Sequence, residues 1–388
     1  MSRRHVFYIC GFDPNSPGRY HRLFSEGARQ QAAMSGAAIE VGARQRVDAE
    51  TVAWAVRYEQ HGHVTDTRYV LPRWDAIVRE HWLRGFWPQL FDLLGTSWLY
   101  LRTGALWTML GQTWLGFITV FAPFFLVMTL LPGAAALLWA VGALAHAGLK
   151  GHPLGIPAAL AAGGLVAAGW WAYWARRHWY TRWILRGYGF VARVCTVGVT
   201  ALDERLDGMA AALVRQAQAR EDDEILVIGH SLGTALAVSV MARAIRQDPA
   251  LMRHGPAIGL LTLGHCTPML SNLPSARRFR DELRTLAEAA DLCWVDFSDP
   301  IDAYSFGGVD PVAAAGLRAA RPGHPQVRSP HFLSLYRPGP QQRQRMNQHE
   351  LHQQYLCASR PGDAYDFFAM AAGPSRLAQR FGVLAAAA

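Results

Sequence analysis

Residues 224–235 read Glu-Ile-Leu-Val-Ile-Gly-His-Ser-Leu-Gly-Thr-Ala, and this stretch decides the fold. The unbroken aliphatic run at its start predicts a buried strand, and the residues after it predict a helix. Between the two, Gly229, Ser231 and Gly233 form a Gly-x-Ser-x-Gly pattern. Because the two glycines lack side chains, strand and helix can approach closely while Ser231 occupies a strained turn. We interpret Ser231 as a nucleophile at the end of a strand; an ordinary tight turn is the alternative.

Short apolar strands and amphipathic helices alternate on both sides of this motif. This alternation predicts an α/β fold, in which helices cover both faces of a mainly parallel sheet. Two strands separated by His61-Gly62-His63 resemble a hairpin. The expected strands are 6–10, 52–59, 64–71, 225–228, 258–263 and 292–297, and the expected helices are about 20–34, 202–219, 232–246 and 276–289.

The composition indicates a membrane protein with more than one structural part. The chain has 388 residues, of which 51% are hydrophobic and only 17% charged, whereas about a quarter are charged in ordinary globular proteins. The net charge of +9 comes mostly from scattered arginines without a basic helix. We therefore expect anionic lipid rather than nucleic acid as the partner. The five cysteines include no Cys-x-x-Cys pair, which favours buried thiols over disulfides or a metal site.

A long apolar stretch divides the chain. Between Arg102 and Arg176 there is no acidic residue, and Lys150 is the only lysine or arginine. Because a helical span needs about 20 apolar residues, we place two spans at 117–140, with a possible kink at Pro132, and at 156–175. Strand 6–10 and the later strands would belong to one sheet, so the chain must cross the membrane an even number of times between them. Two spans are therefore preferred over three. A buried helical hairpin is the alternative.

Basic residues near the ends of the spans predict their orientation. Arg102 precedes the first span and several arginines follow the second, while Lys150 lies alone between them. Both flanking segments should therefore face the cytoplasm. The Trp-rich stretch 82–114 predicts helices that lie at the membrane interface. We divide the chain into an N-terminal part of the sheet domain with interfacial helices (1–112), a transmembrane hairpin with its basic flank (113–186) and a C-terminal catalytic part (187–388).

Residues 6–12 and about 202–355 together resemble the lipases and esterases of the α/β-hydrolase superfamily, interrupted here by a membrane hairpin. The resemblance rests on the strand, Gly-x-Ser-x-Gly and helix of 224–246 and on the early strand with its Gly11-Phe12 loop. It implies a catalytic acid after a later strand and a histidine last in the chain, an order that this sequence can satisfy. It also implies catalysis without a metal or an organic cofactor.

Three aspartates near strand 292–297 are candidates for the acid. Asp296 lies inside the strand, whereas Asp299 stands at its carboxyl end in an Asp-Pro-Ile sequence that resembles the Asp-Pro-Val of many lipase-like proteins. Asp302 follows in the same loop. We favour Asp299 and keep Asp302 and Asp296 as alternatives, although an aspartate before proline also commonly begins a turn.

Two histidines three residues apart are the main candidates for the base. His349 and His352 share one face if 346–355 is helical. We favour His352, because its His-x-x-Tyr sequence resembles lipase-like relatives more closely. His349 is the main alternative, and His331 and His324 are more remote ones.

The turn around Ser231 also predicts where negative charge would be stabilised. The backbone N–H of Leu232 is at the start of the expected helix, and that of Phe12 follows the early strand, so we expect both to form an oxyanion hole. Cys266 follows a later strand without the second glycine, and we interpret it as structural. The expected activity is hydrolysis of a lipid-like acyl ester. An acyltransferase with the same residues and a non-catalytic membrane scaffold are the alternatives.

Overall fold

In the computed structural model, the described residues are 1–115, 117, 179–332, 348–360 and 365–382, together with scattered positions between 135 and 169. The described strands form one nine-stranded sheet in the order β2-β4-β5-β1-β6-β7-β8-β9, with β3 paired to β4. The strands are β1 (Ser2–Ile9), β2 (Ala38–Val41), β3 (Gln45–Arg46), β4 (Thr51–Gln60), β5 (His63–Pro72), β6 (Glu224–His230), β7 (Ala257–Leu263), β8 (Cys293–Phe297) and β9 (Gln326–Arg328).

The sheet is mostly parallel, as the sequence predicts. Strands β5, β1, β6, β7, β8 and β9 run parallel, and the antiparallel pairs involve β2, β3, β4 and the hairpin of β4 with β5. The buried early strand β1 pairs directly with the motif strand β6, with Ile9 opposite Gly229. The loop that follows β1 therefore begins beside the turn that carries Ser231.

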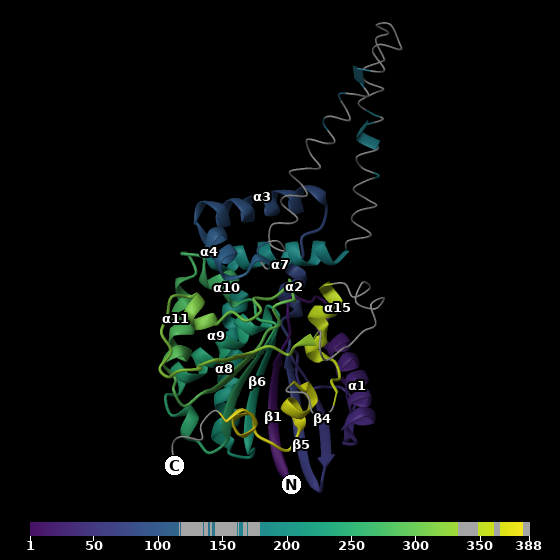
Figure 1. Cartoon of the computed structure of the whole chain (residues 1–388), viewed down its shortest axis with the longest axis vertical. Coiled ribbons are helices and arrows are strands. Elements are labelled where there is room, and N and C mark those ends of the chain that lie inside the picture. Colours follow the sequence, from purple (N-terminus) through teal and green to yellow (C-terminus); the bar gives the residue numbers. More distant parts are fainter. Residues whose placement is uncertain are drawn as a thin grey trace.

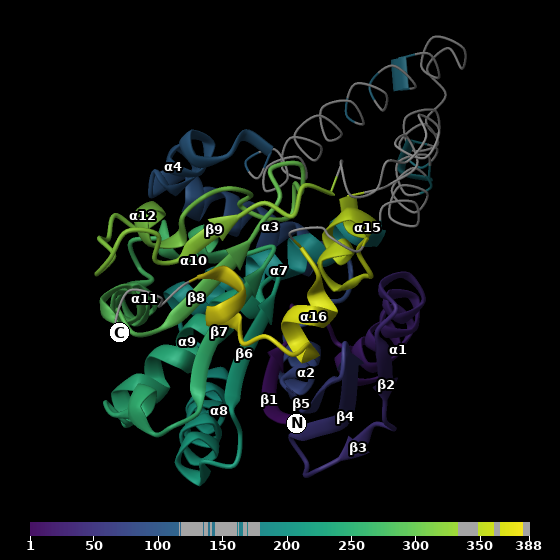
Figure 2. The same cartoon turned by 60° about the horizontal axis from the view of Figure 1, so that its bottom comes forward.

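Helices are distributed over both faces of the sheet and over its carboxyl end (Figures 1 and 2). The α-helices are α1 (Ser16–Ser35), α2 (Asp75–Glu80), α3 (Phe86–Arg102), α4 (Ala105–Gln112), α7 (Trp179–Thr196), α8 (Thr200–Ala219), α9 (Gly233–Gln247), α10 (Thr267–Ser271), α11 (Arg277–Glu288), α12 (Pro311–Ala314), α15 (Gln348–Gln353), α16 (Phe367–Ala372) and α17 (Leu377–Phe381). Two short 3₁₀ helices are η1 (Leu251–Arg253) and η2 (Gln354–Leu356).

The alternation of side chains in β1 and β6 separates the two helical layers. A Cβ on Gly229 would lie 2.9 Å from the Cβ of Ala237, so this face of β6 meets α9. Tyr8 pairs with Ile228, the residue of β6 before Gly229. Its side chain instead contacts Tyr20 of α1, with ring centroids 5.4 Å apart. This mixed α/β sheet with helices on both faces is compatible with an α/β-hydrolase-like fold.

Helices α3, α4 and α7 lie together at the carboxyl end of the parallel strands (Figure 1). Asp92 of α3 forms an ion pair with Arg193 of α7. Gly189 of α7 permits this approach, because any Cβ there would overlap the Asp92 carboxylate. Tyr100 anchors α3 further by donating a 2.8 Å hydrogen bond to the carbonyl of Met269.

The Trp-rich stretch 82–114 is largely helical, in α3 and α4, as predicted. Within the described part of the chain, no helix is both long and apolar enough to cross a membrane. The predicted spans 117–140 and 156–175 lie outside the described residues except for a few single positions.

Candidate active site

Ser231 sits at the sharp turn between β6 and α9. Its backbone is in the left-handed region, with φ of 59°, which is unusual for a residue with a side chain. The flanking glycines are sterically required: a Cβ on Gly233 would overlap the carbonyl oxygen of Ile9, and one on Gly229 would lie 2.7 Å from Thr234 Cα. The close contact of β1, β6 and α9 thus depends on the two glycines that the sequence pattern contains.

His352 is held by an aspartate and lines the same cavity as Ser231. Its Nδ1 lies 2.7 Å from Oδ2 of Asp302, and both side chains are almost fully buried. The other imidazole nitrogen, Nε2, is buried and has no hydrogen-bond partner among the described residues. This is the arrangement of a general base: one nitrogen is fixed by a carboxylate and the other is left for a proton transfer.

The structure pairs His352 with Asp302, the alternative, and not with Asp299, which the sequence favours. One carboxylate oxygen of Asp299 accepts the N–H of Phe332 at 2.8 Å, and the other accepts the N–H of Ile301 at 3.1 Å. Asp299 therefore organises the loop after β8. Asp296 points elsewhere, accepting hydrogen bonds from Thr262 at 2.6 Å and from Ser298 at 2.8 Å.

The remaining candidate histidines have other contacts. His349 reaches the cavity, but its Nε2 lies 3.3 Å from Nη2 of Arg19. Burial and then the positive charge of Arg19 lower the pKa of His349 to about 3. His324 Nε2 lies 2.8 Å from the carbonyl of Leu286, and His331 is exposed. Of the four candidate histidines, His352 is the one that contacts Asp302.

Asp302 is suited to remain an anion. Burial alone raises the pKa of this carboxyl, but the neighbouring His352 and the N–H of Tyr304 reverse the effect, and the pKa is lowered overall. The Tyr304 N–H donates to Oδ1 at 3.0 Å, leaving Oδ2 for the imidazole. A buried aspartate that stays ionised can orient the imidazole and stabilise its charged form.

His230, inside the motif itself, contacts His352. Its Nε2 lies 3.0 Å from the backbone oxygen of His352, and the two rings are 4.9 Å apart. Burial and then the proximity of His352 lower the pKa of His230 to about 3, so its ring is neutral near pH 7 and donates from Nε2. This bond ties α15 to the carboxyl end of β6.

The backbone around Ser231 offers two N–H groups for an oxyanion. A Cβ on Gly11 would lie 3.0 Å from the Cβ and 3.4 Å from the Oγ of Ser231, so the loop after β1 passes directly over the serine. Within the described part of the chain, the N–H groups of Phe12 and Leu232 donate to no protein acceptor. Trp183 of α7 donates its indole N–H to the Phe12 carbonyl, in the peptide that follows the one carrying the Phe12 N–H. The two predicted donors are therefore both near Ser231.

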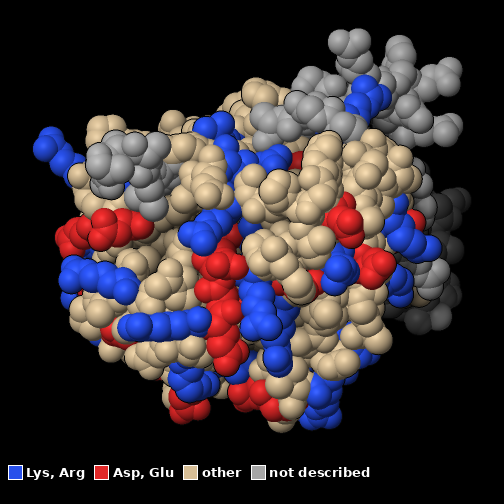
Figure 3. Space-filling view, turned by 90° about the horizontal axis from the view of Figure 1, so that it is seen from below, with Lys and Arg blue, Asp and Glu red and all other residues tan. Residues whose placement is uncertain are grey.

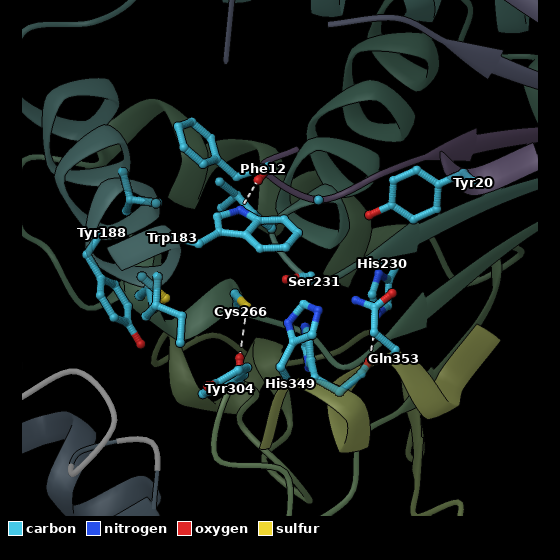
Figure 4. A pocket seen from close by; sticks show the side chains of 17 residues that line it. Phe12, Tyr20, Trp183, Tyr188, His230, Ser231, Cys266, Tyr304, His349 and Gln353 are labelled. Atoms are coloured by element: carbon cyan, nitrogen blue, oxygen red, sulfur yellow. Dashed lines mark hydrogen bonds between the residues drawn. The ribbon is translucent and has the colours of Figure 1, made fainter. Parts of the chain in front are cut away.

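The cavity is partly open to solvent and leaves about 90 Å³ for the centres of water-sized molecules. Its lining is mostly apolar and aromatic, and it combines segments far apart in the sequence (Figure 4). The lining residues that sequence reasoning missed are Tyr20 of α1, Trp183, Ile184, Tyr188 and Val191 of α7, and Met269 and Tyr304 of later loops and helices. No local motif marks them, because each is an apolar or aromatic residue in an ordinary helical or loop sequence.

Cys266 also lines the cavity but is unsuited to be the nucleophile. Burial raises the pKa of its thiol to about 12, and its Sγ lies 3.4 Å from the Tyr304 carbonyl oxygen. The thiol therefore stays protonated. Among the residues that the structure describes, no cluster of three or more His, Cys, Asp or Glu side chains could hold a metal ion.

Comparison of the chain with protein-family models, with curated proteins and with solved structures finds no match. The functional interpretation therefore depends on the geometry of the site.

Proposed function

We propose that the chain is a serine hydrolase of the α/β-hydrolase type that cleaves an acyl ester with Ser231, His352 and Asp302. The observation that carries this proposal is the 2.7 Å contact between Asp302 and Nδ1 of His352, whose Nε2 is left without a partner among the described residues. Ser231 lines the same cavity from a strained turn. Strain at a polar residue in a cavity is typical of a nucleophile.

The chemistry follows from these positions. His352 takes the proton of Ser231 as Oγ bonds to the ester carbonyl carbon, and the oxygen that becomes negative is stabilised by the N–H groups of Phe12 and Leu232. The bond to the leaving alcohol breaks as His352 returns the proton to that alcohol. Water then attacks the acyl-enzyme with the same histidine as base, releasing the acid and restoring Ser231.

The substrate that we propose is lipid-like. The aromatic and aliphatic lining of the cavity favours an acyl chain over a charged group. The sequence adds the two proposed spans, 117–140 and 156–175, which would anchor the enzyme with its catalytic part facing the cytoplasm. An acyltransferase would form the same acyl-enzyme and pass the acyl group to an alcohol in place of water.

A fluorophosphonate probe tests the proposal, because it reacts with an activated serine. The full chain should be labelled and should hydrolyse a short water-soluble ester, and Ser231→Ala should lose both properties. Ser25→Ala, on α1 and bonded only to its own helix through the carbonyl of His21, is the control that keeps them.

Equal labelling of Ser231→Ala and wild type would refute the nucleophile. Absence of labelling and of hydrolysis in the folded wild type would favour the non-catalytic scaffold. Faster release of the acyl group to an added alcohol than to water would identify the acyltransferase.

A further inference from the structure

Helices α3 and α4 carry a row of large apolar side chains on the outside of the molecule. We call this row the interfacial face; its members are Trp87, Phe91, Trp98 and Leu101 of α3, Trp107 and Leu110 of α4, and Trp114, which lies two residues after α4. Each of the four tryptophans exposes 60% or more of its surface. An exposed apolar patch of this kind on a folded chain marks an interaction surface.

The face is built by helical spacing. Trp87, Phe91, Trp98 and Leu101 recur every three, four or seven residues, which places them along one side of α3. The opposite side, with Leu93, Ser97, Leu99 and Tyr100, is buried in the protein. The helix thus packs into the protein through this buried side, while the tryptophans of its other side are mostly exposed.

Within segment 81–114, the exposed charged residues are all positive. From residue 81 to residue 114 the only charged residues are Arg84, Asp92 and Arg102, and both arginines are exposed. Asp92 is turned inward to its ion pair with Arg193. The opposite end of the molecule differs, since Lys or Arg and Asp or Glu are interspersed there (Figure 3). Helices α3 and α4 therefore add no exposed acidic group to this end of the molecule.

We propose that the interfacial face rests in the headgroup layer of a bilayer containing anionic lipid. Tryptophan is suited to this layer because its ring is apolar and its indole N–H is polar. The exposed Arg84 and Arg102 would meet anionic headgroups. A symmetric contact with a second copy would instead bring Arg84 and Arg102 of two chains toward one another, and α3 and α4 expose no acidic residue that could pair with them. The chain itself points to lipid, because α4 ends at Gln112 just before the apolar sequence that starts at residue 117.

This inference rests on the proposed function and names the source of its substrate. Helix α7 lies between the interfacial face and the cavity: it packs against α3, and its residues Trp183 and Tyr188 line the cavity. Docking through α3 and α4 would therefore hold the catalytic end of the molecule at the membrane (Figure 1). The substrate class that fits is an acyl ester of a membrane lipid, taken from the bilayer on which the enzyme rests.

Contact with lipid is tested by placing a fluorophore on the face. Trp98→Cys in the full chain is labelled with an NBD maleimide and reconstituted in phosphatidylcholine and phosphatidylglycerol nanodiscs, with or without brominated acyl chains. Val47→Cys is the matched control, because Val47 is also an exposed apolar residue but lies beside β3. Wild type, whose cysteines are buried or half-buried, measures background labelling.

We expect brominated lipid to quench the label at position 98 and aqueous iodide to quench the label at position 47. Quenching of position 98 by iodide alone would overturn the proposal, because the face would then be in water. Protection of position 98 from both quenchers would also overturn it, because the face would then be covered by protein, either another segment of the chain or a second copy.

A second measurement separates this inference from the proposed function. Replacing Trp87, Trp98, Trp107 and Trp114 together by serine should reduce hydrolysis of an ester embedded in the nanodisc several-fold and leave hydrolysis of a water-soluble ester unchanged. Equal loss on both substrates, with the fold retained, would overturn the docking role. If wild type hydrolyses neither ester, the proposed function fails, whereas the quenching result still decides whether the face meets lipid.

Discussion

The two carboxylate oxygens of Asp302 have different partners. Oδ2 faces Nδ1 of His352 at 2.7 Å, and Oδ1 accepts the N–H of Tyr304 at 3.0 Å. The backbone bond prevents the carboxylate from rotating away, and full burial of the side chain keeps water from competing. The same pair of contacts selects the imidazole tautomer, because an anion at Nδ1 requires the proton there.

Replacing one carboxylate oxygen of Asp302 by an amide nitrogen should therefore have a large effect on kcat. Asp302→Asn keeps the shape but replaces the anion by an amide, so the imidazole loses both its tautomer preference and its counter-charge. We expect kcat to fall about 10³- to 10⁴-fold. Asp299→Asn is the matched control, since Asp299 accepts backbone N–H groups of Ile301 and Phe332, and its kcat should change less than tenfold. A greater loss in Asp299→Asn, measured by steady-state ester hydrolysis, would return the role to Asp299.

Tyr20 adds a polar group that the sequence does not reveal. Its ring is buried under α1, and in Figure 4 its hydroxyl is directed into the cavity toward Ser231. Burial raises the pKa of Tyr20 well above its usual value, so the hydroxyl stays a donor at every working pH. We expect Tyr20→Phe to lower kcat about tenfold to a hundredfold by removing a donor near the oxyanion. The control is Tyr58→Phe on β4, and equal kcat values for the two variants would remove Tyr20 from the mechanism.

Individual site residues were predictable only where a local pattern constrains them. Ser231 and Leu232 follow from the strand, two glycines and helix of the motif, and Phe12 follows from its place after an early strand. Asp299 and Asp302 stand three residues apart in one loop, and the direction of each carboxylate depends on how that loop turns. That turn is set by contacts with Phe332 and Tyr355, far along the chain, which no local pattern encodes.

Among the elements, the tightest constraint is the junction of β1, β6 and α9. A Cβ on Gly233 would overlap the Ile9 carbonyl oxygen, so α9 could begin there only if β1 moved aside. The glycines of the motif thus serve the strand pairing as well as the exposure of the serine. Displacement of β1 would also shift the loop of Gly11 and Phe12, in which Gly11 lies close to Ser231.

Two glycine-to-alanine variants distinguish the steric overlap at Gly233 from the general effect of alanine on helix stability. Gly233→Ala should destabilise the fold by about 3 kcal/mol through overpacking and should reduce labelling of Ser231. Gly208→Ala, in the exposed middle of α8 where a Cβ would meet nothing within 4 Å, should stabilise by about 0.5–1 kcal/mol. Thermal unfolding midpoints check both. A Gly233→Ala protein as stable as wild type would show that β1 and α9 can separate without cost.

The larger elements were predictable because their periodicity is strong. The strand predicted at 258–263 is β7 (Ala257–Leu263), and the helix predicted at 276–289 is α11 (Arg277–Glu288). The short strands β2, β3 and β9 were not predicted, because their few half-exposed or exposed residues give no clear alternation. The layering of α3 over α7 also escapes sequence reasoning, since it depends on Gly189 and on an ion pair across about a hundred residues.

At the scale of the whole molecule, the site depends on chain segments that only the sheet brings together. The proposed nucleophile follows β6, a proposed oxyanion donor follows β1, the proposed acid follows β8, and the proposed base lies on α15. Parallel strands end at one edge of the sheet, so the three loops meet there. The wall supplied by α7 comes after the apolar stretch, and the cavity is therefore complete only when both halves of the chain have folded together.

The same burial that shapes the site makes the molecule sensitive to acid. Burial lowers the pKa of His230 to about 3 and, with Arg68 as a second cause, the pKa of His5 to about 4, against a usual value of 6.5. Between pH 6.5 and these values the unfolded chain binds more protons than the folded chain. Stability is therefore fully present above pH 6.5 and falls as the pH decreases, by up to about 1.4 kcal/mol per pH unit for each such histidine.

His230→Gln should reduce this dependence, because glutamine can still donate to the His352 carbonyl but does not titrate. Thermal unfolding midpoints of the full chain at pH 7 and pH 5 measure the effect. Wild type should lose more stability between these values than His230→Gln does, whatever the variant's stability at pH 7. His63→Gln, at the exposed first residue of β5, should behave as wild type. An equal loss in wild type and His230→Gln would mean that the buried imidazole is protonated in the folded state, in which case it could not stay neutral beside His352.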